Sequence, residues 1–281
     1  MATFQGRKTV LLTGASAGLG LATLEILLSH SINVVALQRT ETPELTALAS
    51  RYPGVLLIVK GDVSKDEDNK AAVEAAMQSF GRLDAVILNA GTVHPVSAIR
   101  DLSASSGKLD EFRQLMEVNF VSLVSLLTHA IPYLNVRDGK SLEEGAPAGR
   151  VVLVSSGAAT GGVTGWAAYN ASKAAMNSLG RTLGNEEPDI VTVAIRPGTP
   201  NTQMQTTIRE IGANHMSPSD HARFLNLHRD NKLLPPSEPA GVLAGAALQA
   251  PKEWSGSFRS WNDEDVLGVQ MKEVEVEGEG K

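Results

Sequence analysis

The chain has 281 residues, a formal net charge of −6 and no cysteine. The missing cysteine excludes disulfides, thiolate nucleophiles and cysteine-ligated metals, and the six histidines lack paired metal-binding spacings, so no metal is expected. We also expect no membrane span, no secretion signal and no nucleic-acid partner, and hence a cytoplasmic protein.

Short apolar runs alternate with longer stretches of helical periodicity. We predict buried strands at Thr9–Leu12, Asn33–Leu37, Val55–Val59, Ala85–Leu88, Val151–Val154 and Val191–Ile195. Helices are predicted between them, at Leu19–Leu28, Pro43–Arg51, Glu67–Phe80, Leu109–Tyr133 and Ala168–Leu183. This alternation predicts an α/β fold with one doubly wound parallel sheet and helices on both faces.

Two segments and the C-terminal end break this rhythm. The polar stretch Asn135–Gly149 is predicted to be a connection, and residues 200–236, interrupted by glycine and proline, are predicted to form a helical lid. From Asp263 the chain becomes acidic and shows no apolar face. We therefore expect one domain over residues 1–265 and a disordered acidic tail over residues 266–281.

A glycine-rich turn, Thr13-Gly14-Ala15-Ser16-Ala17-Gly18-Leu19-Gly20, follows the first predicted strand. Glycines at this spacing permit a tight turn and a close approach of the backbone to a pyrophosphate, which the helix N-terminus attracts. The alternative is a similar turn without a ligand, but the flanking strand and helix favour a Rossmann-type dinucleotide site. Its expected contacts are Gly14, Ser16, Gly18, Leu19 and Gly20.

The end of the second predicted strand bears on the choice between NAD(H) and NADP(H). A site selective for NAD(H) usually offers a carboxylate to the ribose 2′-hydroxyl there, whereas this chain has Gln38 and Arg39. The cation would pair with a 2′-phosphate, which favours NADP(H), although an exposed arginine without a ligand fits the pattern equally well. Further cofactor contacts are expected at neighbouring strand ends, from Asp62, Val63, Asn89, Ala90 and Gly91.

Ser156, Tyr169 and Lys173 follow the fifth predicted strand. A separation of four residues places Tyr169 and Lys173 on one face of a helix, where the ammonium group would lower the pKa of the phenol. This pair predicts a general acid–base, and Ser156 would hydrogen-bond a carbonyl oxygen beside it. The plain alternative is a helix whose tyrosine and lysine only reach toward water.

Taken together, these residues resemble the short-chain dehydrogenase/reductase family over about Lys8 to Asp263. The resemblance rests on the glycine turn, the Asn-Ala-Gly triplet, Asn119, Ser156, Tyr169 with Lys173, and Arg196-Pro197-Gly198 followed by Thr202. It implies catalytic roles for Asn119, Ser156, Tyr169 and Lys173, and cofactor contacts from Tyr169, Lys173, Pro197, Gly198 and Thr202. It also implies that Asn119 turns a helix carbonyl toward a proton-relaying water, with a satisfied core amide as the alternative.

Within the family, the chain most resembles sepiapterin reductases and the related benzil reductases. The similarity lies in Gly165-Trp166-Ala167-Ala168-Tyr169, Thr202-Gln203-Met204-Gln205 with Arg209-Glu210, Lys232-Leu233-Leu234 and Ser255-Gly256. It implies a substrate pocket bordered by Trp166 and Met204, although plain packing would also account for both side chains. The expected substrate is a ketone or diketone, either an aromatic diketone or a compound that resembles the pterin side chain. Ser260 replaces the acidic residue with which sepiapterin reductases hold the pterin, so a pterin is less suitable than a diketone or aromatic ketone.

Two further departures concern the cofactor. Pro200 stands where the family usually offers a backbone N–H to the nicotinamide carboxamide, and proline has no such group. Ala17 stands where relatives that prefer NADP(H) often carry a basic residue, which leaves Arg39 as the support for the phosphate.

We therefore expect an NADPH-dependent carbonyl reductase in which Ser156 positions a small-molecule carbonyl compound and Tyr169 protonates the nascent alkoxide. The alternative is a catalytically silent NADP(H)-binding regulatory protein, which Pro200 and the acidic tail suggest and the intact catalytic set disfavours. Family members commonly pair through the helices that correspond to Leu109–Tyr133 and Ala168–Leu183, which implies a homodimer or homotetramer.

Overall fold

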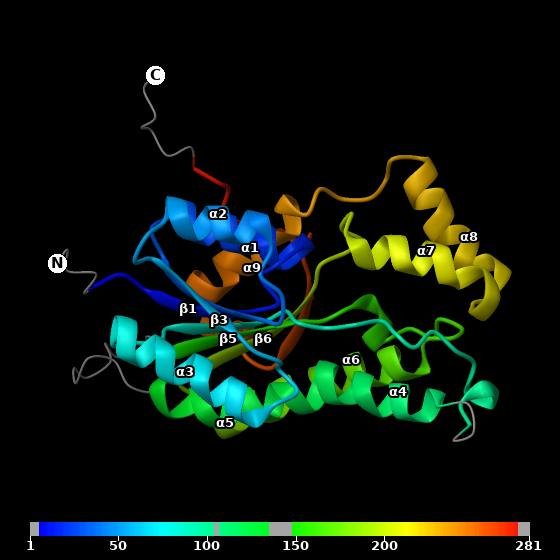
Figure 1. Ribbon diagram of the computed structural model, residues 1–281, viewed down its shortest axis with the longest axis horizontal. Helices are drawn as coiled ribbons and strands as arrows, with labels where there is room; N and C mark the ends of the chain where they lie inside the picture. The colour runs from blue at the N-terminus through cyan, green and yellow to red at the C-terminus, as the bar shows by residue number, and fades with distance from the viewer. Residues whose placement is uncertain (1–5, 104–106, 135–147, 275–281) are drawn as a thin grey trace.

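A seven-stranded parallel sheet lies at the centre of the computed structural model, which describes residues 6–103, 107–134 and 148–274 (Figure 1). Its strand order is β3-β2-β1-β4-β5-β6-β7. The strands are β1 (Thr9–Thr13), β2 (Asn33–Gln38), β3 (Leu56–Lys60), β4 (Ala85–Leu88), β5 (Gly149–Val154), β6 (Ile190–Arg196) and β7 (Ser257–Ser260). The order reverses between β1 and β4, and ligands of doubly wound sheets bind outside the carboxyl ends of the strands at such a point.

Helices cover both faces of the sheet, which confirms the predicted fold class (Figure 1). One face carries α1 (Gly18–Ser29), α2 (Pro43–Arg51), α9 (Ser237–Gln249) and the short α10 (Glu264–Leu267). The other carries α3 (Asp66–Phe80), α4 (Lys108–Met116), α5 (Ser122–Leu134) and α6 (Ala167–Glu186). The remaining long helices, α7 (Gln203–His215) and α8 (Pro218–Arg229), lie beyond the carboxyl ends of the strands and are named the cap helices below.

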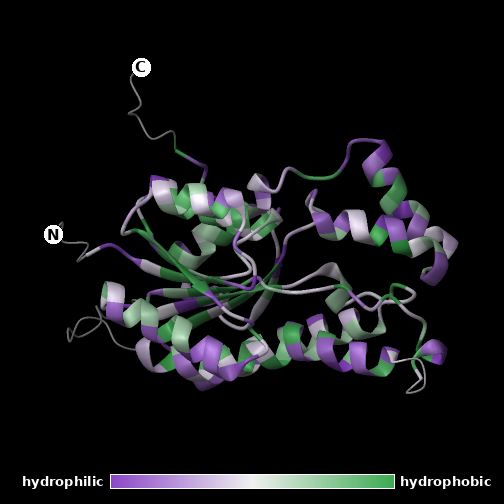
Figure 2. Cartoon of the chain, viewed as in Figure 1, coloured by the Kyte–Doolittle hydropathy of each residue, from purple (hydrophilic) through white to green (hydrophobic). Residues whose placement is uncertain are grey.

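The sheet is apolar along its central strands because both of its faces are covered (Figure 2). Successive strand residues point to opposite faces. Val10 and Leu12 accordingly pack into the core beneath α1 and α9, whereas Leu11 packs into the core beneath α3, α5 and α6. This continuous burial explains why the strands read as short uninterrupted apolar runs.

Helix α9 and strand β7 were not predicted from the sequence, for opposite reasons. Residues 239–248 of α9 are buried on every side, so the helix has no polar face and no helical period. Strand β7 is short and mostly polar and lies at the edge of the sheet beside β6. The predicted lid also differs from expectation, because α7 continues through Gly212, one of the glycine and proline residues expected to interrupt its helices.

The predicted helix Leu109–Tyr133 is interrupted. A π-helical turn, Glu117–Val121, separates α4 from α5. Sequence analysis excluded a membrane span, yet residues 108–134 are long and apolar enough for one by length and composition. A core helix passes the same test, and Leu123, Leu126 and Leu127 of α5 are buried in the core shared with α3 and the sheet.

The predicted disordered tail begins too early. Val266 is fully buried, and the Met271 amide donates to the Gly241 carbonyl of α9 at 3.0 Å. A Cβ atom on Gly245 would overlap with the Val269 carbonyl, so the small residues of α9 admit this main chain. The few apolar residues of the predicted tail are spaced irregularly among charged ones, so the sequence pattern did not indicate that this segment packs against the domain. Residues 275–281, and 135–147 of the predicted polar connection, lie outside the described residues.

Candidate active site

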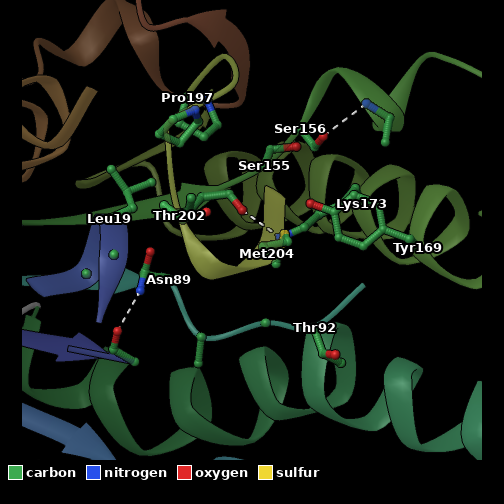
Figure 3. A pocket seen from close by; sticks show the side chains of 18 of the residues that line it. Leu19, Asn89, Thr92, Ser155, Ser156, Tyr169, Lys173, Pro197, Thr202 and Met204 are labelled. Atoms are coloured by element: carbon green, nitrogen blue, oxygen red, sulfur yellow. Dashed lines mark hydrogen bonds between the residues drawn. The ribbon is translucent and has the colours of Figure 1, made fainter. Parts of the chain in front are cut away.

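A cleft of about 1130 Å³ opens at the carboxyl ends of the strands (Figure 3). With one exception, every predicted site residue lines it. These residues are Gly14, Ser16, Gly18, Leu19, Gly20, Gln38, Arg39, Asp62, Val63, Asn89, Ala90, Gly91, Ser156, Trp166, Tyr169, Lys173, Pro197, Gly198, Thr202 and Met204. The exception is Asn119, which is fully buried behind the cleft.

The glycine turn forms one end of the cleft, where α1 begins. Gly14 has a φ of 70°, and a Cβ atom on Gly20 would overlap with the Gly14 carbonyl, so both positions require glycine. Asn89 Nδ2 at the end of β4 donates to the carbonyls of Thr13 and Gly14, both at 3.0 Å. Helix α1 has no side-chain cap at Ala17, and its first residues, Gly18, Leu19 and Gly20, line the cleft. This rigid cradle fits a pyrophosphate.

The end of β2 forms the next part of the cleft wall. Gln38 is 4% exposed, and within the described residues its Oε1 and Nε2 atoms have no hydrogen-bond partner. Buried amides are normally paired, so this orphaned group also fits a bound ligand. The guanidinium of Arg39 is exposed and lies 3.9 Å from Asp62 Oδ2. Burial raises the Asp62 pKa, but hydrogen bonds from Ser64 and the charges of Arg39 and Lys65 outweigh it and leave that pKa below its ordinary value.

Tyr169 and Lys173 lie one turn apart on α6, as the spacing predicted. Lys173 Nζ lies 5.8 Å from the centre of the Tyr169 ring and donates to the Val154 carbonyl at 2.7 Å. Burial lowers the pKa of Lys173 to about 8. Burial also raises the pKa of Tyr169, against a smaller opposite effect of the hydrogen bond with Ser156. The expected lowering of the Tyr169 pKa is therefore wrong, because burial outweighs the neighbouring groups.

Asn119 lies in the π-helical turn and joins two parts of the site. Its Oδ1 accepts from the Thr92 amide at 2.8 Å, and its Nδ2 donates to the Thr92 carbonyl at 2.8 Å and to Ser172 Oγ at 3.2 Å. Ser172 Oγ in turn donates to the Tyr169 carbonyl at 2.8 Å. The side chain is thus a satisfied amide that ties the loop after β4 to the catalytic helix. Its predicted role in a water relay stays a prediction.

The cap helices close the other end of the cleft. Trp166 contacts the Tyr169 ring edge-on, with ring centres 5.3 Å apart, and the Phe224 ring of α8 at 5.4 Å. Met204 and Ile208 of α7 line the same wall. Sequence analysis missed Ile208, Arg223 and Phe224 because it proposed a lid without assigning its inward face. It also missed Trp261 and Asn262, which follow the unpredicted β7 and could have been found from the rule that ligands bind at strand ends.

Known proteins are similar to this chain in sequence and architecture. A family model for short chain dehydrogenases matches residues 8–211. The chain belongs to the short-chain dehydrogenase family. An uncharacterized oxidoreductase of Schizosaccharomyces pombe is 41% identical over 255 residues, which are 90% of this chain and 96% of that protein. A benzil reductase of Saccharomyces cerevisiae that forms (S)-benzoin is 35% identical over 94% of this chain and 99% of its own length, so the predicted likeness to benzil reductases is confirmed.

Solved structures give the same result. A short-chain dehydrogenase/reductase of Saccharomyces cerevisiae has a TM-score of 0.85 and 33% identity and covers 94% of this chain and 99% of its own. A 3-ketoacyl-(acyl-carrier-protein) reductase of Brucella melitensis, solved with NADH, has a TM-score of 0.74 and 26% identity over 92% and 97% of the two chains. A Saccharomyces cerevisiae structure described as a cytoplasmic protein of unknown function has a TM-score of 0.73 and 32% identity over 94% and 99%. The protein is therefore an oxidoreductase of a family that binds nicotinamide cofactors.

Proposed function

We propose that this oxidoreductase is an NADP(H)-dependent carbonyl reductase that acts on flat ketones or diketones. The observation that carries the proposal is the convergence of Ser156, Tyr169 and Lys173 on one wall of the cleft that also contains the phosphate cradle (Figure 3). A proton donor, an oxygen-binding hydroxyl and an ammonium group in one place suit reduction of a carbonyl group.

The residues of the cleft suit a dinucleotide. The N-terminus of α1 would hold the pyrophosphate, Arg39 the 2′-phosphate, and the orphaned amide of Gln38 the adenosine portion. When bound, NADPH supplies the hydride. The two residues at the end of β2, Gln38 and Arg39, offer no carboxylate that could bind the ribose 2′-hydroxyl. This supports NADP(H) over NAD(H).

The chain itself supplies orientation and the proton. The Ser156 hydroxyl would hydrogen-bond the substrate oxygen and hold it toward the phenol of Tyr169. The raised pKa of Tyr169 keeps this phenol protonated at neutral pH, as a proton donor requires. Lys173, with a pKa of about 8, is charged at neutral pH and would restore the proton to Tyr169. Asn119 would support this supply through the loop after β4 and Ser172.

The substrate end suits a flat apolar compound. Trp166, Met204, Ile208 and Phe224 make its walls, and the cap helices would act as a lid over them. The benzil reductase relative acts on a diketone with two aromatic rings, which matches such walls. Ser260 lines the cleft at the position where sepiapterin reductases hold the pterin with an acidic residue, so a pterin is less suitable than a diketone.

The test is turnover with purified protein, followed at 340 nm with NADPH and separately with NADH. The panel contains benzil, aromatic ketones, simple aldehydes and sepiapterin. Turnover of diketones with NADPH supports the proposal, turnover only with NADH refutes the cofactor assignment, and no turnover with any carbonyl refutes the reaction. Within the described residues, no structural feature favours the alternative of a catalytically silent regulatory protein.

Assembly and compartment complete the proposal. Val121, Val124 and Tyr133 are each more than a third exposed along the π-helical turn and α5, which supports pairing of this helix with a second copy as a homodimer or homotetramer. Light scattering coupled to gel filtration tests this, and a monomer at micromolar concentration would refute it. The relative described as cytoplasmic supports a cytoplasmic location, which fractionation would check.

A further inference from the structure

Three successive residues at the end of β5 are each bound to a different turn of α6. Tyr169, Lys173 and Asn177 are spaced four residues apart and therefore share one helix face. Tyr169 is hydrogen-bonded to Ser156, and Lys173 to the Val154 carbonyl. Ser155 lies between Val154 and Ser156, and its hydroxyl donates to Asn177 Oδ1 at 2.6 Å. The proposed mechanism uses Tyr169 and Lys173 but assigns no role to Asn177.

The bond between Ser155 and Asn177 is buried and short. Ser155 is 2% exposed and Asn177 7% exposed. The Ser155 amide also donates to the Ile195 carbonyl at 2.8 Å, so this residue is fixed to β6 as well as to α6. A buried hydrogen bond contributes modestly when made, and an unpaired buried partner is costly when the bond is broken. Removal of either side chain should therefore shift the helix relative to the strand end rather than leave it in place.

The position of this bond determines what it can control. Ser155 directly precedes Ser156, which would hold the carbonyl oxygen, and Asn177 lies two turns beyond Tyr169 on the same helix face. The neighbouring link from Lys173 uses an ammonium group whose protons the proposed reaction needs. The bond between Asn177 and Ser155 uses no atom that the proposed reaction changes.

We propose that Asn177 is a positioning residue that acts through Ser155 to hold Ser156 and Tyr169 in register for proton transfer. This inference rests on the proposed carbonyl reduction. Displacement of reacting groups by about 1 Å can cost a large factor in rate, so the expected effect is on kcat. Dinucleotide affinity should change little, because the phosphate cradle lies on β1 and α1.

The experiment compares Asn177→Ala, Ser155→Ala, the double variant and Ser155→Thr, which keeps the hydroxyl. We expect kcat with benzil to fall about tenfold in each alanine variant. KM for NADPH should stay within about twofold, and the double variant should be no slower than the slower single one. Ser155→Thr should recover most of the rate. Ser257→Ala is the matched control, because its hydroxyl donates to the Trp254 carbonyl at 2.6 Å at the opposite end of the sheet.

A second readout needs no turnover. The phenol of Tyr169 is titrated by its absorbance at 295 nm, as the difference between each variant and the same variant with Tyr169→Phe. Loosening of α6 would admit water and move the Tyr169 pKa down toward its ordinary value in both alanine variants. An unchanged titration, or unchanged kcat in both alanine variants, would overturn the positioning role. Loss of reductase activity in the wild-type protein would instead refute the proposed function and leave the titration to decide the positioning of Tyr169.

Discussion

Pro200 and Leu234 pair as a parallel bridge and so join the two ends of the segment that contains the cap helices. The pairing uses the Asn201 amide, which donates to the Leu234 carbonyl at 2.9 Å, and the Leu234 amide, which donates to the Thr199 carbonyl at 3.1 Å. A missing N–H at Pro200 therefore costs this bridge nothing. The bridge therefore holds the two ends of the segment that contains the cap helices at one place beside the cleft.

Replacement of Tyr169 by phenylalanine should abolish proton donation and keep the fold. The phenol is buried and contacts Trp166, and phenylalanine preserves that ring packing. We expect kcat to fall about 10²- to 10⁴-fold, with unchanged NADPH binding measured by fluorescence. Tyr52→Phe is the control, because Tyr52 lies at the C-terminal end of α2 and does not line the cleft. Near wild-type turnover of Tyr169→Phe would exclude Tyr169 as the acid.

Replacement of Lys173 by methionine should stabilise the protein at pH 7 and inactivate it. Burial lowers the Lys173 pKa from 10.5 to about 8, so between these values the unfolded chain binds a proton that the folded chain has lost. Stability attributable to this group therefore rises with pH across that window and is lowest below pH 8, where a buried ammonium must be accommodated.

We expect Lys173→Met to raise the free energy of unfolding at pH 7 by about 2 kcal/mol, and the advantage to shrink toward pH 10. Urea denaturation at both pH values measures this. A variant less stable than wild type at pH 7 would show that the bond to the Val154 carbonyl outweighs the cost of burial.

Replacement of Arg39 by serine should weaken recognition of the 2′-phosphate. A charge-assisted hydrogen bond to phosphate is worth roughly 1.5–3 kcal/mol, so calorimetry should show at least about tenfold weaker binding of 2′,5′-ADP. Binding of 5′-ADP should change little. Arg51→Ser is a suitable control, because Arg51 lies over Tyr52 on α2. Equal weakening of both nucleotides would contradict a specific phosphate contact.

Replacement of Gly165 by alanine should displace the cap helices. Gly165 has a φ of 82°, and a Cβ atom there would lie 2.5 Å from the His215 carbonyl at the end of α7. We expect a loss of at least about 1 kcal/mol from the backbone alone and a raised KM for the carbonyl substrate. Gly162→Ala is the control, because no atom lies within 4 Å of its Cβ position. Equal melting temperatures and KM values for the two variants would contradict this coupling.

The sequence was sufficient to predict the parts of the site that depend on short intervals between residues. The glycine turn and the pair Tyr169 and Lys173 are set by intervals within one turn and one helix, and both were found. The upward shift of the Tyr169 pKa depends on burial in a cluster that includes Ile208 and Phe224 of the cap helices. No local sequence pattern encodes this burial. The π-helical turn that places Asn119 adds one residue to a helical period, so a sequence pattern alone reads straight through it.

The packing of residues 266–274 against α9 and α1 moves the effective end of the folding unit. A chain shortened after residue 265, where acidity suggests that order stops, would lose buried Val266 and uncover the close-packed glycines of α9. It would also remove the Val274 amide that donates to Ser29 Oγ at the last turn of α1. Such a truncated protein should aggregate, which light scattering during refolding would measure. Main-chain fit, rather than charge composition, therefore determines where this protein can be cut.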